Sequence, residues 1–290
     1  MRCMKPELVV KTRAEVGEGP IWDPTTQTLV WVDITGSAIH RYDPATGQNT
    51  TIQTGVHVGA VAVRASGGLV LAAEDGFRGL DPDGTQSLLA AVEHGNPAMR
   101  MNDGKCDRRG RFWAGTMAYD EAGSPGLGSL YRLDPDLQVV QMVEGVSISN
   151  GIDWSPNDCL MYFIDSRSQT VDVFDFDVDT GSIQNRRTLI EVDAAIGLPD
   201  GMTVDAQGDL WVAMWGGARI SRYAPDGTPR GAFRFPVSQT SSCGFGGSGL
   251  EDLYVTTAAR GISEDAEPDA GSLYKFTPGV TGQMPNEFAG

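Results

Sequence analysis

A pattern that recurs six times along the 290 residues constrains the fold more than any other feature. Each copy places a large apolar residue inside a short run of β-forming residues. These anchor residues are Trp31, Leu71, Trp113, Phe163, Trp211 and Tyr254, with successive gaps of 40, 42, 50, 48 and 43 residues. Repeats of this length are typical of radial or solenoid arrays rather than of one continuous layered fold.

A second apolar run follows each anchor. The runs are IHRYDP (39–44), FRGLDP (77–82), LYRLDP (130–135), VDVFDF (171–176), ISRYAP (220–225) and LYKFTP (273–278). Such short runs, bounded by Gly, Pro and Asp, predict strands, and helical periodicity is nowhere sustained for three turns. About 45 residues per copy is enough for four strands, which is one blade of a propeller.

We therefore predict an all-β fold, with residues 1–290 forming a single six-bladed β-propeller domain. Leu8-Val9-Val10 precedes the first copy and could add the outer strand to the last blade. The alternative is a β-sandwich in which the regular spacing is a coincidence. Closure into a ring favours the propeller, because it leaves only short, protected sheet edges.

The charge balance limits the classes of partner. With 38 acidic against 22 basic residues, the net charge is −16, which opposes binding to phosphate backbones and anionic membranes. No apolar run reaches 18 residues, and the first ten residues lack the apolar stretch of a secretory signal. We expect a cytoplasmic protein, a monomer or weak homo-oligomer, whose partner is a small molecule.

The cysteines fit that expectation. None of the four lies in a CxxC pair: Cys3, Cys106, Cys159 and Cys243. Reduced, mostly buried thiols are the default interpretation for this pattern in a cytoplasmic protein.

Polar residues recur at one level of the predicted channel. The innermost strand of each blade lines the channel, and the position 11 to 13 residues before the anchor holds Glu18, Asn102, Asn150 or Asp200 in four of the six copies. The second copy has Val58-Gly59 there, and the sixth has Ser241-Ser242-Cys243. Asn-Gly and Asp-Gly pairs are also ordinary turn formers. Glu is a poor turn residue, however, and the shared register favours a common site.

Two carboxylates and an amide suggest a metal site. Oxygen ligands of this kind suit a hard or borderline divalent cation, with water filling the remaining positions. Because neither His nor Cys belongs to the set, Ca²⁺, Mg²⁺ or Mn²⁺ is favoured over a soft-ligand metal, with Zn²⁺ as a further alternative.

Several motifs together resemble a known family, over essentially the full length. They are GEGPIWD (17–23), RMNDGKCDRRGRFWAGTM (100–117), SNGIDWS (149–155), TVDVFDFD (170–177), LPDGMTVDAQGDLWVAMWGG (198–217) and CGFGG (243–247). In combination they are similar to the senescence-marker-protein/gluconolactonase/regucalcin family. The resemblance implies a six-bladed propeller with one divalent ion in its channel, Ca²⁺ foremost, and it implies a sugar lactonase.

The resemblance also implies roles for individual residues. Glu18, Asn150 and Asp200 match the metal ligands, and Arg100 and Asn102 match residues that hold substrate oxygens. The acidic substrate contact falls on Asp120, where some relatives carry Glu. Because Asp is one carbon shorter, the neighbouring Glu121 is the alternative.

These roles predict a mechanism for lactone hydrolysis. The cation would polarise the ester carbonyl and lower the pKa of a bound water. Asp200 is the candidate to take a proton from that water, either as a ligand or from beside the ion. Arg100 would anchor sugar oxygens or stabilise developing negative charge, and Asn102 and Asp120 would bind ring hydroxyls. The alternatives are an organophosphate-hydrolysing propeller and a non-catalytic calcium-binding regulatory protein.

Overall fold

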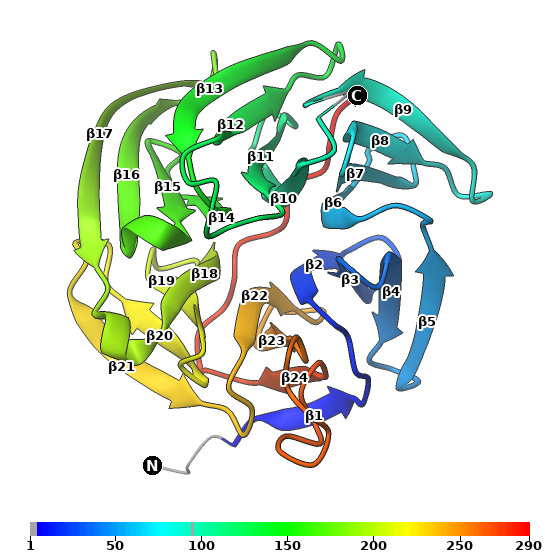
Figure 1. Cartoon of the computed structure of the whole chain (residues 1–290), viewed down its shortest axis with the longest axis vertical. Coiled ribbons are helices and arrows are strands. Elements are labelled where there is room, and N and C mark those ends of the chain that lie inside the picture. The colour runs from blue at the N-terminus through cyan, green and yellow to red at the C-terminus, as the bar shows by residue number, and fades with distance from the viewer. Residues whose placement is uncertain (1–4, 94–95) are drawn as a thin grey trace.

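Six four-stranded antiparallel sheets surround a central axis in the computed structural model, which describes residues 5–93 and 96–290 (Figure 1). The predicted all-β, six-bladed propeller is therefore confirmed. Within each blade the strands follow one another outward from the channel in chain order, and the last blade takes its outermost strand from the N-terminus.

The blades are numbered along the chain. Blade one holds β2 (Gly17–Asp23), β3 (Thr28–Asp33), β4 (Ala38–Asp43) and β5 (Gln48–Gln53), and blade two holds β6 (Val58–Val63), β7 (Leu69–Ala73), β8 (Gly76–Leu80) and β9 (Gln86–Ala91). Blade three holds β10 (Met99–Cys106), β11 (Phe112–Ala118), β12 (Gly128–Leu133) and β13 (Val139–Val146). Blade four holds β14 (Ser149–Trp154), β15 (Leu160–Asp165), β16 (Thr170–Asp177) and β17 (Ser182–Glu191). Blade five holds β18 (Leu198–Val204), β19 (Leu210–Trp215), β20 (Arg219–Tyr223) and β21 (Pro229–Arg234), and blade six holds β22 (Thr240–Gly246), β23 (Asp252–Thr257), β24 (Leu273–Phe276) and β1 (Glu7–Val10). The short 3-10 turns η1 (Ser166–Ser168) and η2 (Ala194–Ile196) lie in blade four and between blades four and five.

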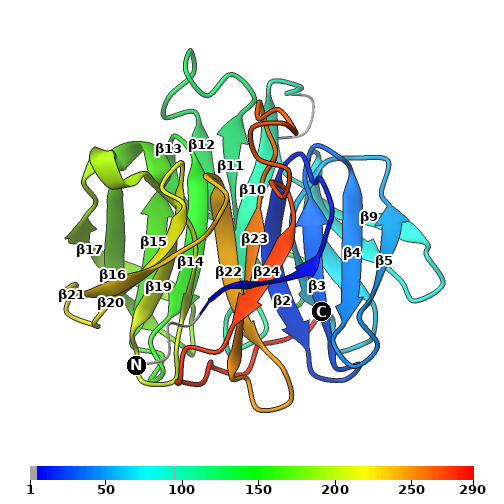
Figure 2. The same cartoon turned by 90° about the horizontal axis from the view of Figure 1, so that it is seen from below.

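The two ends of the chain close the ring. As predicted from Leu8-Val9-Val10, β1 pairs antiparallel with β24, with Leu8 opposite Tyr274 (Figure 2). A blade assembled from both ends of the chain resists opening, because the ring cannot open at this blade without breaking the ladder between β1 and β24.

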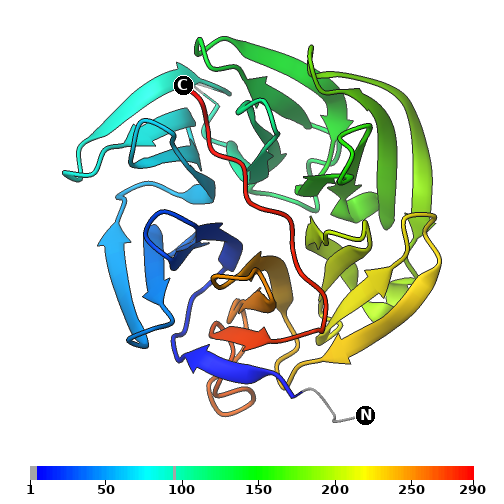
Figure 3. The same ribbon diagram turned by 180° about the vertical axis from the view of Figure 1, so that it is seen from behind.

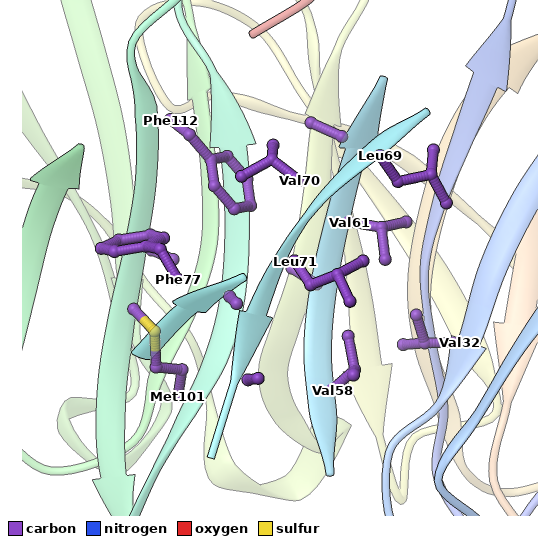
Figure 4. Packing of buried hydrophobic residues seen from close by; sticks show 14 of the residues in the cluster. Val32, Val58, Val61, Leu69, Val70, Leu71, Phe77, Met101 and Phe112 are labelled. Carbon is purple, nitrogen blue, oxygen red and sulfur yellow. The ribbon is translucent and has the colours of Figure 1, made fainter. Parts of the chain in front are cut away.

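The six anchors pack the blades against one another. All lie on the second strand of their blade, and none is more than 1% exposed: Trp31, Leu71, Trp113, Phe163, Trp211 and Tyr254. Figure 4 shows one cluster, in which Phe77 of blade two lies beside Phe112 of blade three with ring centroids 5.7 Å apart. Large apolar side chains between adjacent sheets provide the burial that stabilises each blade against its neighbour.

A C-terminal segment, residues 281–289, crosses one end of the channel (Figure 3). The side chain of Gln283 donates a hydrogen bond to the carbonyl of Trp154, and that of Asn286 donates one to the carbonyl of Cys106. The backbone N–H of Phe288 donates to the carbonyl of Val63. The segment therefore ties several blades together and covers this end of the channel, which we call the covered end.

The described cysteines are free, and their burial differs. Cys106 and Cys243 are buried, as expected for most of the thiols, and Cys159 is exposed in the turn before β15. Cys3 lies outside the described residues. No helix in the described part of the chain is both long enough and apolar enough to cross a bilayer.

Candidate active site

A register shift interrupts the innermost strand of every blade at the same level. It falls between Glu18 and Ile21, Val58 and Ala60, Met101 and Gly104, Ser149 and Ile152, Pro199 and Met202, and Thr240 and Ser242. In a regular strand, residues three apart point to opposite faces. An extra residue at a bulge changes that alternation, so that a residue and the one three positions later both face the channel.

Glycines beside these shifts let adjacent innermost strands approach closely. A Cβ on Gly151 would lie 2.8 Å from the carbonyl oxygen of Asp200, and one on Gly201 would lie 2.1 Å from Oγ of Ser242. Both distances are too short for a side chain to fit. The Asn150-Gly151 and Asp200-Gly201 pairs therefore lie within strands and allow close packing around the axis, and interpreting them as turns would be wrong.

Five of the six predicted site residues meet in one cavity of ≈ 340 Å³ at the end of the channel opposite the C-terminal segment, which we call the open end. They are Glu18 on β2, Arg100 and Asn102 on β10, Asn150 on β14 and Asp200 on β18. All are buried apart from the surface that they present to the cavity.

A chain of hydrogen bonds orients the amide groups in this cavity. Nη1 of Arg100 donates to Oδ1 of Asn102 (2.5 Å), and Nδ2 of Asn102 donates to Oδ1 of Asn150 (3.0 Å). Nδ2 of Asn150 donates to Oγ of Ser166 (2.7 Å), which donates to the carbonyl of Pro199 (2.6 Å). This order leaves one lone pair on Oδ1 of Asn150 free to bind a further partner.

The two acidic residues are buried without a salt bridge, and the positive charge of Arg100 only partly offsets the cost of ionising them. Burial raises the pKa of Glu18 well above its usual value, and the carboxylates of Asp200 and Asp103 raise it further. Burial likewise raises the pKa of Asp200, with added repulsion from Asp103 and Glu121. Neither Glu18 nor Asp200 forms an ion pair with any residue in the described ranges. A bound cation would relieve this repulsion.

The donor set fits a hard divalent cation. Nowhere in residues 5–93 and 96–290 do three His, Cys, Asp or Glu side chains form a group suited to a metal. A metal in this cavity would therefore use the amide oxygen of Asn150 beside the carboxylates of Glu18 and Asp200. Carboxylate and amide oxygens are ligands that Ca²⁺ accepts readily.

Arg100 is the basic residue that the hydrogen-bond chain connects, through Asn102, to the candidate ligand Asn150. Burial lowers the pKa of Arg100, while the negative charges of Glu121 and Glu18 oppose that shift. Its guanidinium lies 5.9 Å from the ring centre of Tyr119, within the range of a cation–π contact. A buried guanidinium held in this way can donate to a negatively charged oxygen without first losing a water shell.

Asp120 does not line the cavity, whereas Glu121 does. The carboxylate of Asp120 instead accepts a hydrogen bond from the backbone N–H of Gly123 (3.0 Å) in its own loop. Oε1 of Glu121 lies 3.0 Å from Nη1 of Arg260, and the Glu121 carbonyl accepts a hydrogen bond from Arg167 (3.0 Å). The structure thus favours the alternative that the sequence left open.

Two residues at the site escaped the sequence interpretation. Ser166, which fixes the orientation of Asn150, follows the anchor Phe163 by three residues and could have been found by extending the repeat alignment. Arg260 lies on a long loop after β23, and no local signal connects it to Glu121, 139 residues away.

Comparisons with known proteins agree with this architecture. The family model described as "SMP-30/Gluconolactonase/LRE-like region" matches residues 16–259. Regucalcin of Xenopus laevis is 42% identical over 299 residues, with both chains covered in full. A luciferin-regenerating enzyme superposes with a TM-score of 0.91 at 33% identity, covering 98% of this chain and 99% of its own. A calcium-binding protein, regucalcin, from Agrobacterium tumefaciens superposes with a TM-score of 0.93 at 28% identity, covering 98% and 97%.

Proposed function

The chain belongs to the SMP-30/gluconolactonase/LRE-like family, and we propose that it is a metal-dependent hydrolase that opens the ester bond of a sugar lactone to give the aldonic acid. One observation carries the proposal. The buried oxygens of Glu18, Asn150 and Asp200 share a cavity with Arg100 and Asn102, and neither carboxylate forms a salt bridge among the described residues, so that burial and mutual repulsion outweigh the attraction of Arg100.

Glu18, Asn150 and Asp200 would hold one divalent ion, with Ca²⁺ foremost and Zn²⁺, Mg²⁺ or Mn²⁺ as alternatives. When bound there, the ion supplies Lewis acidity toward the lactone carbonyl and lowers the pKa of water.

Asp200 takes the proton from the attacking water. A general base works best when its pKa lies near the working pH, and burial moves the pKa of Asp200 in that direction. A bound cation would lower that pKa again, so the carboxylate retains only part of this basicity. Asp200 therefore combines two roles, as a ligand and as a base, or acts as a base from beside the ion.

Arg100 and Asn102 hold the substrate. The Arg100 guanidinium donates to the lactone oxygens and stabilises negative charge as the carbonyl carbon becomes tetrahedral. Both amide hydrogens of Asn102 are already used, by Oδ1 of Asn150 and the carbonyl of Ser149. Asn102 therefore binds a ring hydroxyl as an acceptor, through Oδ1. Glu121, rather than Asp120, is the acidic contact that we propose for a second hydroxyl.

Two other functions remain as alternatives at the same site. Relatives that carry the name regucalcin favour a calcium-binding regulatory protein without turnover. An organophosphate-hydrolysing propeller would need the same ion, but it would have no use for the hydroxyl-binding groups of Arg100 and Asn102.

A pH-indicator assay separates the three functions. We expect purified protein to release acid from D-glucono-1,5-lactone in the presence of Ca²⁺, to lose that activity with a chelator and to regain it when a divalent ion is added. Thermal unfolding with and without Ca²⁺ reports binding independently of activity. A calcium-dependent rise in Tm without turnover of any lactone would identify the regulatory protein, and turnover of a phosphotriester alone would identify the organophosphate hydrolase.

A further inference from the structure

The cavity has a second ring of residues, one step nearer its mouth. The residue two positions before each proposed metal ligand is apolar: Val16 before Glu18, Ile148 before Asn150 and Leu198 before Asp200. Side chains two apart on a strand share a face, and two residues rise roughly 6.6 Å. All three apolar residues line the same cavity as the ligands.

This ring is not uniform around the channel. On blade three the equivalent position, two before Asn102, is Arg100. On blades four and five it is Ile148 and Leu198, and Leu198 pairs across strands with Trp215, which also lines the cavity. We call Ile148, Leu198 and Trp215 the apolar wall. Blades one, four and five thus each place an apolar residue at this level, blade three places a charged one, and the apolar residues of blades four and five are joined by Trp215.

The apolar wall is exposed to the cavity rather than covered by protein. Leu198 is 37% exposed although it belongs to a channel-lining strand. A simple sugar lactone carries hydroxyl groups on most of its carbons. Hydroxyls placed against this wall would lose hydrogen bonds to water and gain none in return, which lowers affinity.

We infer that the substrate is a lactone that carries an alkyl substituent, and that the substituent lies against Ile148, Leu198 and Trp215. Its carbonyl and remaining ring oxygens then face Arg100 and Asn102 on blade three. The inference rests on the proposed lactonase function and narrows its substrate class from sugar lactones in general to lactones with one apolar side. The observation that carries it is that the apolar wall lines the same cavity as the oxygen ligands Glu18, Asn150 and Asp200.

The test uses δ-lactones whose substituent beside the ring oxygen lengthens from hydrogen to methyl, propyl and pentyl, with D-glucono-1,5-lactone measured alongside. We expect kcat/KM to rise roughly four-fold per added methylene until the wall is covered, the ratio that corresponds to ~0.8 kcal/mol per buried CH₂ group. Leu198→Ser should flatten that rise. The matched control is Leu88→Ser, which alters a leucine of similar exposure, 45%, on the outer strand β9 and should leave the rise unchanged.

The outcomes separate the two proposals. Turnover of D-glucono-1,5-lactone with no increase along the alkyl series would overturn the apolar-wall inference and leave the lactonase intact. If no lactone is hydrolysed, the lactonase fails, and binding of the matching alkyl δ-lactams, measured by thermal shift, decides the inference. The inference is supported if lactam affinity increases with the length of the alkyl chain and this increase disappears in Leu198→Ser. It is overturned if affinity does not depend on chain length.

Discussion

The two ends of the channel are built from the same strands, but they differ in whether a salt bridge neutralises their buried carboxylates. Each end has a cavity of ≈ 340 Å³. Residues three apart line the two cavities: Asn102 and Lys105 on β10, Asn150 and Asp153 on β14, and Asp200 and Thr203 on β18. The bulge in each innermost strand is what places both members of a pair in the channel.

At the covered end the carboxylate is neutralised. Oδ2 of Asp153 lies 2.8 Å from Nζ of Lys105 and accepts hydrogen bonds from Oγ1 of Thr203 (3.1 Å) and the N–H of Val204 (2.8 Å). At the open end neither Glu18 nor Asp200 forms a salt bridge within the described chain, and Glu18 accepts a hydrogen bond from the backbone N–H of Gly19 (3.0 Å). Residue type alone therefore does not distinguish a structural carboxylate from a functional one. The presence or absence of a salt bridge does help, because a buried carboxylate without one is costly to ionise, and such groups are concentrated at sites that bind a ligand.

The largest expected effect is at the open end. Asp200→Asn should lower kcat by roughly 10²–10⁴-fold, because it removes the proton acceptor. With a chelator present, the free energy of unfolding should not fall, since the amide relieves repulsion among buried carboxylates. Steady-state kinetics and urea unfolding measure the two quantities. An unchanged kcat would show that another group is the base.

Removing the carboxylate at the rim of the open end should have a smaller effect. Glu121→Gln should reduce kcat/KM for a sugar lactone about 10-fold, the value of one hydrogen bond to a charged group. Asp120→Asn is the matched control, since among the described residues the Asp120 carboxylate accepts its hydrogen bond from its own loop. The reverse result, with Asp120→Asn impaired and Glu121→Gln active, would restore the assignment made from the resemblance.

At the covered end the expected effect is on stability. Asp153→Asn leaves the ammonium of Lys105 without its counterion and should lower the free energy of unfolding by about 1–3 kcal/mol, with kcat/KM nearly unchanged. Asp81→Asn, which breaks the more exposed pair with Arg64, should cost less than ~1 kcal/mol. If Asp153→Asn lost activity but kept its stability, the assignment of a structural role to the covered end and a functional role to the open end would be wrong.

The last expected effect is a pH dependence of stability from Asp103, the residue that follows Asn102 on β10. Burial raises the pKa of Asp103 to about 6 from its ordinary value of 3.8, so the folded protein favours the protonated acid. This contribution to stability is fully present below pH 3.8 and is lost as the pH rises through about 6. Urea unfolding with a chelator, from pH 4 to 7, should show Asp103→Asn gaining stability relative to the unmodified protein. A constant difference between the two across this range would exclude the shift.

Much of the candidate site could be predicted from the sequence, because the residue pattern that indicates it lies within each repeat. Glu18, Asn102, Asn150 and Asp200 occupy equivalent places in the repeat, and strands of one register in a closed ring present equivalent residues at one height. Glu121 was harder to choose over Asp120, because a loop of irregular backbone does not keep the alternation of a strand. The side chain that reaches the cavity depends on how Arg260 and Arg167, from other blades, hold the loop.

The sequence by itself determined the six blades, their buried anchors and the oxygen-rich level of the channel, because alternation along a strand and repetition along a chain are local properties. Only the tertiary structure decided which end of the channel is covered, which carboxylates acquire a counterion and which side of the cavity is apolar. Those features depend on contacts between blades and on a C-terminal segment that crosses them, and such contacts exist only once the ring has closed.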